Sequence, residues 1–213
     1  MSDVLASLSK LVIEGKKDDI AAVTQRALDA GHDPQEILNK GLMPGMDYVG
    51  VEFRAGNMFV PEVLRSARAM QASMDIIKPL LVETGAGMVG KILIGTVKGD
   101  LHDIGKNLVA MMCEGAGFEM KDLGKDVGPD DFVRGVKEFE PDVVGMSALL
   151  TTTMRSMEMT IKGLQEAGLR DKVKIMIGGA PVTQEFADKI GADGYASNAA
   201  SAVDMAKKFV GAA

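Results

Sequence analysis

The pattern of apolar residues changes abruptly near residue 87, and this change constrains the fold more than any other feature of the sequence. Up to about residue 84, apolar side chains recur at the three- and four-residue spacing of amphipathic helices. Beyond that point, short apolar runs alternate with helical stretches. The pattern therefore predicts two domains, a helical one over residues 1–86 and an α/β domain over residues 87–213.

The first domain is expected to be a small bundle of four or five short antiparallel helices. Asp33-Pro34 is typical of a helix N-cap followed by proline at the first helical position. Pro44 should bend or interrupt the helix that follows. Residues 53–57 indicate a loop, and a further helix is expected to begin near Pro61.

The second domain is expected to be a doubly wound, five-stranded parallel sheet of the Rossmann-like or flavodoxin-like type. Strands are predicted at residues 91–96, 118–123, 143–146, 173–177 and 194–196. Helices are predicted at residues 104–114, 130–139, 154–167, 183–190 and 201–210. Ligands of such sheets bind beyond the carboxyl ends of the strands, where the winding reverses. The loops after the first, third and fourth strands are therefore the candidate site.

Composition argues against several classes of function. Lys and Arg total 24 against 30 Asp and Glu, a formal net charge of −6, which disfavours a nucleic-acid partner. No apolar run approaches the ~20 residues of a membrane helix, and no signal segment begins the chain. The lone Cys113 is expected to be a buried, inert thiol, and we expect a cytoplasmic protein. Two histidines and one cysteine are too few for a multi-His or multi-Cys metal site, so any metal is expected to arrive inside a cofactor.

The first predicted strand is followed by a loop that carries a carboxylate and an imidazole. Asp100 and His102 are two residues apart, so an extended loop directs both side chains to the same side. A metal-ligating histidine usually donates its other ring N–H to a carboxylate, and Asp100 is placed to accept it. Gly105 lets the chain turn and lets a planar ligand approach the backbone. Alternatively, Asp100 or Asp103 only caps the next helix, and His102 is a solvated loop residue.

The third and fourth predicted strands end in residues 147–153, which are rich in hydroxyls, and in Gly178-Gly179-Ala180-Pro181. Alone, a hydroxyl run is often an N-cap, and Gly-Gly before proline is often a turn. Together they follow strands that end at one edge of the sheet. Residues 95–106 contain neither a dinucleotide motif nor a phosphate loop, which disfavours nucleotide binding. The charge run at residues 121–126 is expected to be a solvated loop.

This combination of motifs resembles the cobalamin-binding domain family, whose pattern is Asp-x-His-x-x-Gly, about forty residues, Ser-x-Leu, a little under thirty residues, and Gly-Gly. The corresponding elements here are Asp100-x-His102-x-x-Gly105, 41 residues, Ser147-x-Leu149, 28 residues, and Gly178-Gly179. Residues 50–62 resemble the cap segment of cobalamin-dependent methionine synthase and of small corrinoid methyl carriers. The resemblance spans about residues 5–210 and is closest to the stand-alone corrinoid proteins of three-component methyltransferase systems.

The resemblance implies a role for each residue toward cobalamin, as methylcobalamin or a related corrinoid. The lower benzimidazole arm would be detached from cobalt, with His102 as the metal ligand, Asp100 orienting it and the Thr153 hydroxyl completing a relay. Further residues would contact the cofactor: Asp103, Ile104 and Gly105 beside His102, and Ser147, Leu149, Gly178 and Gly179 along the slot for the detached arm. Phe53 and Val60 would cap the methyl-bearing face, whereas Met58 and Phe59 are expected in the helical core.

The resemblance also implies a corrinoid methyl carrier that is not catalytic alone. It would pass a methyl group from a substrate-specific methyltransferase to a second methyltransferase acting on tetrahydrofolate or a thiol, with a reductive activase as a further partner. Two partners imply a helical cap that moves about a hinge near residues 84–87. The alternatives are a cobalamin-dependent sensor, the small subunit of a mutase, and a flavodoxin-like module without a corrinoid. The sequence does not specify the methyl donor, whether methylamine, methanol, betaine or aryl ether.

Overall fold

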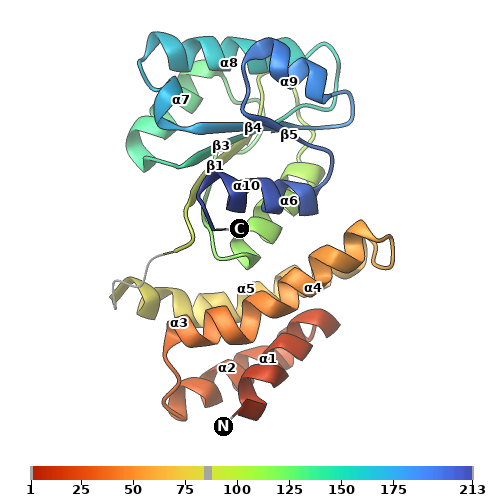
Figure 1. Ribbon diagram of the computed structural model, residues 1–213, viewed down its shortest axis with the longest axis vertical. Helices are drawn as coiled ribbons and strands as arrows, with labels where there is room; N and C mark the ends of the chain where they lie inside the picture. Colours follow the sequence, from red (N-terminus) through yellow and green to blue (C-terminus); the bar gives the residue numbers. More distant parts are fainter. Residues whose placement is uncertain (1, 84–87, 213) are drawn as a thin grey trace. The chain divides into compact units, whose positions relative to one another are not determined.

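The computed structural model describes residues 2–83 and 88–212, which belong to two compact units (Figure 1). The first unit contains the N-terminal helices together with Glu114–Gly117, and the second, Val89–Cys113 and Phe118–Ala213, contains a sheet and its covering helices. The predicted domain boundary after residue 86 and the predicted hinge at residues 84–87 lie outside the described residues.

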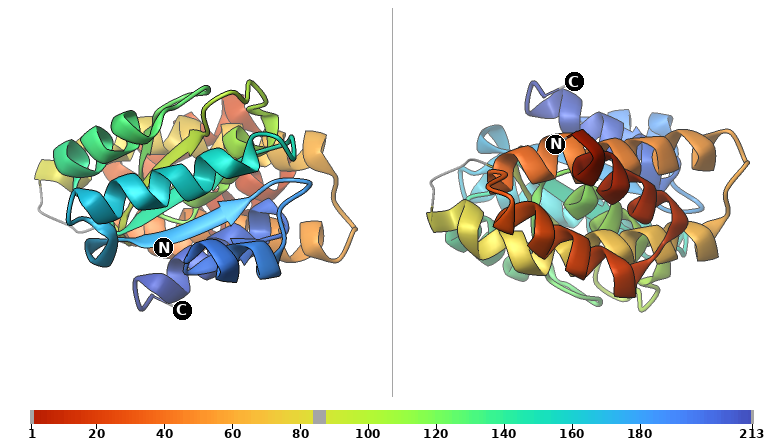
Figure 2. Two further views of the ribbon diagram at one scale, coloured as in Figure 1. Left: turned by 90° about the horizontal axis from the view of Figure 1, so that it is seen from above. Right: turned by 90° about the horizontal axis from the view of Figure 1, so that it is seen from below.

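In the helical unit, the first two helices pack against helices that follow them in the same unit. Its elements are α1 (Ser2–Glu14), α2 (Lys17–Asp29), α3 (Pro34–Glu36), the π-helix η1 (Ile37–Leu42), α4 (Met43–Arg54) and α5 (Val60–Glu83). Helices α1 and α2 lie side by side in the right-hand view of Figure 2. Helix α2 packs along α5, and α1 packs along η1 and α4. Their shared core contains the fully buried Leu8, Ile20 and Met74.

The two prolines act where the sequence predicts. Asp33 is the N-cap of α3, its carboxylate accepts a hydrogen bond from the amide of Gln35 at 2.7 Å, and Pro34 follows it. The interruption expected at Pro44 is the π-turn that ends at Leu42. Helix α4 restarts with Pro44 in its first turn, where the missing N–H has no intrahelical partner to lose.

The loop predicted at residues 53–57 begins too early. Helix α4 continues to Arg54, because the amide of Ala55 still bonds the carbonyl of Val51 at 3.0 Å. The chain turns at Gly56, whose φ of +76° favours glycine. Helix α5 then begins at Val60, one residue before the predicted start.

The second unit contains the predicted parallel sheet. Its strands are β1 (Lys91–Thr96), β2 (Glu119–Asp122), β3 (Val143–Ser147), β4 (Lys174–Gly178) and β5 (Gly194–Ala196), in the spatial order β2-β1-β3-β4-β5. Its helices are α6 (Ile104–Gly115), α7 (Pro129–Phe139), α8 (Met154–Glu166), the 3₁₀ turn η2 (Arg170–Lys172), α9 (Gln184–Ile190) and α10 (Ala199–Phe209). Helices α7, α8 and α9 cover one face and α6 and α10 the other (Figure 1). The predicted fold class is confirmed.

The central strands are apolar along their whole length because helices cover both faces of the sheet. Every residue of β1 after Lys91 is buried, as is β3 up to Met146. Cys113 on α6 is fully buried, and burial raises the pKa of its thiol to about 12, so it is the inert thiol that the sequence predicts.

The winding reverses between β1 and β3, which are neighbours although β2 lies between them in the sequence. From β1 the chain moves outward to β2, toward one edge of the sheet. From β3 it moves to β4, toward the opposite edge. The connections diverge there, and the carboxyl ends of β1 and β3 flank the crevice typical of ligand sites in this fold.

Candidate functional site

The register of the sheet places three predicted motifs next to one another. Thr96 at the end of β1 pairs with Ser147 at the end of β3, which in turn pairs with Gly178 at the end of β4. The Asp-x-His loop, the Ser-x-Leu segment and the Gly-Gly pair therefore start from adjacent strand ends. This edge of the sheet is the candidate site.

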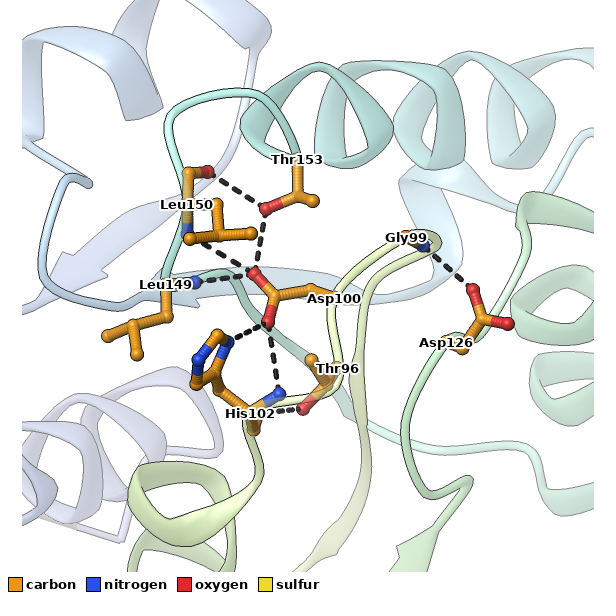
Figure 3. A network of polar contacts seen from close by, with 8 residues as sticks. All are labelled: Thr96, Gly99, Asp100, His102, Asp126, Leu149, Leu150 and Thr153. Carbon is orange, nitrogen blue, oxygen red and sulfur yellow. Dashed lines mark hydrogen bonds and ion pairs between the residues drawn. The ribbon is translucent and has the colours of Figure 1, made fainter.

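Asp100 is the centre of a hydrogen-bond network that joins two of these loops (Figure 3). Its side chain is 0% exposed. Its Oδ1 accepts hydrogen bonds from the His102 amide at 3.1 Å and from the His102 ring at 2.7 Å. Its Oδ2 accepts from Thr153 Oγ1 at 2.7 Å and from the amides of Leu149 at 2.7 Å and Leu150 at 3.2 Å. These five hydrogen bonds fix the orientation of the buried Asp100 carboxylate.

His102 is oriented by this carboxylate and open to a ligand on its other side. Nδ1 of its ring faces Asp100, while the side chain is 52% exposed. An ionised carboxylate only accepts hydrogen bonds, so Nδ1 carries the proton, and in the neutral ring Nε2 keeps a free lone pair. Within the described part of the chain, Nε2 has no hydrogen-bond partner. The ring therefore has the tautomer and the exposure of a metal ligand.

The Thr153 hydroxyl does not serve as a helix cap, although Thr153 is the N-cap residue of α8. Instead it lies 2.7 Å from Asp100 Oδ2 and 2.8 Å from the Leu150 carbonyl oxygen. Both neighbours are acceptors and the hydroxyl has one hydrogen, so it donates to one of them at a time. The Thr153 hydroxyl can therefore donate to Asp100 while the carboxylate is charged, and to the Leu150 carbonyl when it is not.

The network keeps Asp100 ionised. Burial alone raises the pKa of this carboxyl, but the hydrogen bonds from Thr153, Leu149 and His102 outweigh it and hold the pKa well below its ordinary value. A charged Asp100 polarises the imidazole and strengthens Nε2 as a ligand.

The stability of the apo-protein is expected to depend on Asp100 in a pH-dependent way. The unfolded carboxyl has a pKa of about 3.9 and the native one a lower pKa, so below about pH 4 the unfolded chain binds more protons. The contribution of the Asp100 carboxylate to the free energy of unfolding is complete above that pH and is lost as the pH falls through its native pKa. Urea unfolding of the parent and of Asp100→Asn checks this, since the difference between them cancels other carboxyls. The difference should shrink from pH 7 to about pH 3, and a constant difference contradicts the network.

Gly178 and Gly179 form a tight crossing at the end of β4. A Cβ on Gly179 would lie 1.8 Å from the Ala148 carbonyl oxygen, and its φ of +130° is open only to glycine. The Gly178 carbonyl accepts a hydrogen bond from the Ala148 amide at 3.2 Å. These glycines therefore let two strand ends approach each other, and the same bare backbone leaves room for a ligand.

Gly179→Ala is expected to lower the free energy of unfolding by at least about 3 kcal/mol, because it adds backbone strain to a clash with backbone. Gly191→Ala is the matched control. Gly191 has a φ of +78° but nothing within 4 Å of its Cβ position, so only the strain of about 1 kcal/mol applies. Urea denaturation measures both, and equal losses would show that the crossing is not tight.

Apolar side chains gather around His102 without being buried. Leu101 on the Asp-x-His loop, Ile104 at the start of α6, and Leu149 and Leu150 on the loop after β3 are exposed. Gly105 has open space around its Cβ position. Exposed leucines and isoleucine beside a free imidazole nitrogen suit a flat, largely apolar ligand that carries a metal. The donor set, the bare glycines and the apolar rim together fit a corrinoid.

The remaining predicted residues lie as follows. Asp103 is half-buried and directly precedes α6, and its carbonyl accepts a hydrogen bond from the Asn107 amide at 2.8 Å. Ser147 is half-buried at the end of β3. Phe53 is half-buried in the last turn of α4, and Val60 is 37% exposed at the start of α5. Phe53 and Val60 belong to the helical unit, and their position over the cofactor stays a prediction.

The placement of Phe59 in the helical core is wrong, because its side chain is 66% exposed. Phe59 precedes α5, and its amide donates a hydrogen bond to Glu62 Oε2 at 2.8 Å. This cap directs the side chain outward. Met58 is half-buried.

Sequence reasoning missed the contribution of the main chain. The amides of Leu149 and Leu150 donate hydrogen bonds to Asp100. Every residue except proline has such an amide, so the sequence does not show which ones take part. Thr96 was also missed: its buried hydroxyl donates to the His102 carbonyl at 2.9 Å. The sequence did offer a sign of this role, because Thr96 is a hydroxyl residue at the end of an otherwise largely apolar strand.

The described residues contain no group of three or more His, Cys, Asp or Glu side chains able to hold a metal ion by themselves. In the same ranges, no helix has the length and apolarity needed to cross a membrane.

Comparison with known proteins identifies the family. Residues 90–204 match one family model described as a B12 binding domain, and residues 4–78 match a second with the same description. The chain is 47% identical to the dimethylamine corrinoid protein of Methanosarcina barkeri over 209 residues, which are 98% of each chain. The chain belongs to the family of B12-binding corrinoid proteins.

Other relatives extend the similarity over the whole corrinoid protein. Trimethylamine corrinoid protein 2 of Methanosarcina mazei is 45% identical, over 96% of this chain and 95% of that relative. The methanol:cobalamin methyltransferase complex MtaBC of Methanosarcina barkeri contains a chain that is 31% identical, with a TM-score of 0.87 over 99% of this chain and 81% of that one. The sequence-based resemblance is confirmed.

Proposed function

We propose that this corrinoid protein is the methyl carrier of a methylamine methyltransferase system, with Nε2 of His102 as the lower ligand of the cofactor cobalt. The observation that carries the ligand assignment is the 2.7 Å contact between Nδ1 of His102 and the buried Asp100, which leaves Nε2 free. The carrier function rests on the family, and the sensor alternative gains no support from the relatives.

The bound corrinoid supplies a cobalt centre that accepts and releases a methyl group. The residues of this chain set the conditions for that exchange. Asp100 holds His102 in the tautomer with the proton on Nδ1, and Thr153 donates to Asp100. Nε2 of His102 would hold the cobalt, and the charged Asp100 would keep the ring in the tautomer that leaves this nitrogen available.

The cofactor's remaining contacts are assigned to the surrounding surface. Ser147, Leu149, Gly178 and Gly179 are proposed to line the slot for the detached lower arm, and Asp103, Ile104 and Gly105 to contact the cofactor beside His102. Leu149 and Ile104 are exposed, and a Cβ on Gly105 would meet open space. Phe53 and Val60 are proposed to cover the methyl-bearing face.

The methylamine assignment rests on the relatives, since corrinoid proteins of dimethylamine and trimethylamine are 47% and 45% identical to this chain. A methyltransferase is a partner of the family, as in the methanol:cobalamin methyltransferase complex. A second methyltransferase that passes the methyl group to tetrahydrofolate or a thiol, a reductive activase and a cytoplasmic location complete the proposal.

The test is methylation of the reduced, corrinoid-loaded protein by methyltransferases specific for monomethylamine, dimethylamine, trimethylamine or methanol. The absorption spectrum of the cofactor is followed. Rapid methylation with an amine-specific enzyme supports the proposal. Methylation by the methanol enzyme alone contradicts the methylamine assignment, and a protein that takes up no corrinoid contradicts the carrier function.

A further inference from the structure

The charged side chains of residues 121–126 are exposed, as predicted, but the backbone of the loop after β2 is held by hydrogen bonds. The amide of Thr96 donates to the Gly124 carbonyl at 2.9 Å, and the amide of Val127 donates to the Thr96 carbonyl at 2.9 Å. Val97 and Val127 form a further parallel bridge. The loop is therefore paired with the end of β1, just before the Asp-x-His segment.

The base of this loop is anchored by a buried lysine. Lys106 on α6 has a buried side chain that donates to Asn107 Oδ1 at 2.6 Å and forms an ion pair with Asp122. Oδ1 of Asp122 accepts a hydrogen bond from the Gly124 amide at 2.8 Å. The loop that carries Asp126 is thus held to α6 as well as to β1.

Asp126 binds the main chain at Gly99 and at Asp100, and its contact with the Gly99 amide is drawn in Figure 3. Its Oδ1 accepts a hydrogen bond from the Gly99 amide at 2.8 Å, and its own amide donates to the Asp100 carbonyl at 3.0 Å. Its Oδ2 also contacts Lys98 Nζ at 3.1 Å. The last contact is an exposed ion pair of little energetic value, so the two main-chain bonds are the distinctive feature.

The backbone of Asp126 has the left-handed conformation, with a φ of +58°, as does Gly99 with +85°. A non-glycine residue adopts this conformation at a cost, and Asp and Asn tolerate it best. Such strain persists where surrounding contacts over-determine it, and it concentrates at functional sites. Here the contacts that hold it are those to Gly99 and Asp100.

We propose that Asp126 is a positioning residue for His102. By holding the Gly99 amide before Asp100 and the Asp100 carbonyl after its side chain, Asp126 fixes the direction of the Asp100 carboxylate and therefore the direction in which the His102 ring points. The inference rests on the proposed ligation of cobalt by His102.

The test compares Asp126→Gly with Asp126→Asn in the Co(II) corrinoid protein. Glycine keeps the left-handed backbone and removes the acceptor, whereas asparagine keeps both. Electron paramagnetic resonance measures the ratio of cofactor with an axial histidine nitrogen to cofactor without one. Asp126→Gly is expected to lower the ratio about tenfold, the effect of losing one hydrogen bond to a charged group. Asp126→Asn and Lys98→Met should stay within about twofold of the parent.

The outcomes separate this inference from the proposed function. A parent protein without an axial nitrogen contradicts the His102 ligation itself. A parent with that nitrogen and an Asp126→Gly variant with an unchanged ratio overturns the role of Asp126. If Asp126→Gly fails to fold, Asp126→Ala removes the same acceptor at the cost of added left-handed strain, and an unchanged ratio in that variant likewise overturns the role of Asp126.

Discussion

Replacing His102 by alanine is expected to remove the axial nitrogen from the cofactor and to slow methyl transfer at least about hundredfold. Among the residues that the structure describes at this edge, His102 is the histidine with a free ring nitrogen, so we expect no neighbour to replace it. The apo-protein should lose only about 1.5 kcal/mol of its free energy of unfolding, the contribution of the hydrogen bond from the half-exposed ring to Asp100. Resonance spectra, methylation rates and urea denaturation measure the three quantities.

His32 is the matched control, because it is the other histidine of the chain. It also pairs with a carboxylate: its Nδ1 lies 3.0 Å from Glu36 Oε2, but in the helical unit. His32→Ala should retain both the axial nitrogen and the transfer rate. Loss of the nitrogen in His32→Ala, or its persistence in His102→Ala, contradicts the assignment.

Replacing Asp100 by alanine is expected to lower the free energy of unfolding by about 3–5 kcal/mol, a different signature from that of His102. The substitution leaves the partly buried amides of Leu149 and Leu150 without their acceptor, while the Thr153 hydroxyl can turn to the Leu150 carbonyl. The remaining folded protein should bind the corrinoid with a smaller histidine-ligated fraction, because the ring loses its orienting partner. Urea denaturation and resonance spectra measure these effects.

Glu158→Ala controls for the loss of one carboxylate. Glu158 makes an exposed ion pair with Lys162 on α8, and its removal should leave the free energy of unfolding nearly unchanged. If Asp100→Ala costs no more than Glu158→Ala, the buried network does not stabilise the fold in the way its geometry indicates.

The fold was largely predictable from the sequence, because its main signal is a local one. Continuous apolar runs such as residues 91–96 occur where helices cover both faces of a sheet, and the strand at these residues has the predicted bounds. The π-helix before Pro44 and the extension of α4 to Arg54 depend on hydrogen bonds that residue identity does not specify. The exposed Phe59 shows that an apolar residue next to a helix start need not be in the core.

The site was predictable where side chains carry the chemistry and not where the backbone does. The spacing of Asp100 and His102 is visible in the sequence, and their contact has the predicted partners. The hydrogen bonds from backbone amides to Asp100, and the hydrogen bond from the Gly99 amide to Asp126, form only when loops far apart in the chain come together. A charged residue in a charge run gives no sign that its backbone is left-handed and its carboxylate binds an amide.

The most direct test of the central claim is the electron paramagnetic resonance spectrum of the Co(II) corrinoid protein prepared with and without ¹⁵N-labelled histidine. If His102 ligates the cobalt, labelling converts the axial-nitrogen triplets into doublets, and the doublets vanish in His102→Ala. If the triplets persist after labelling, or no axial nitrogen is present, the lower ligand is the cofactor's own base or water. That result would contradict the role of Asp100 and His102 described above.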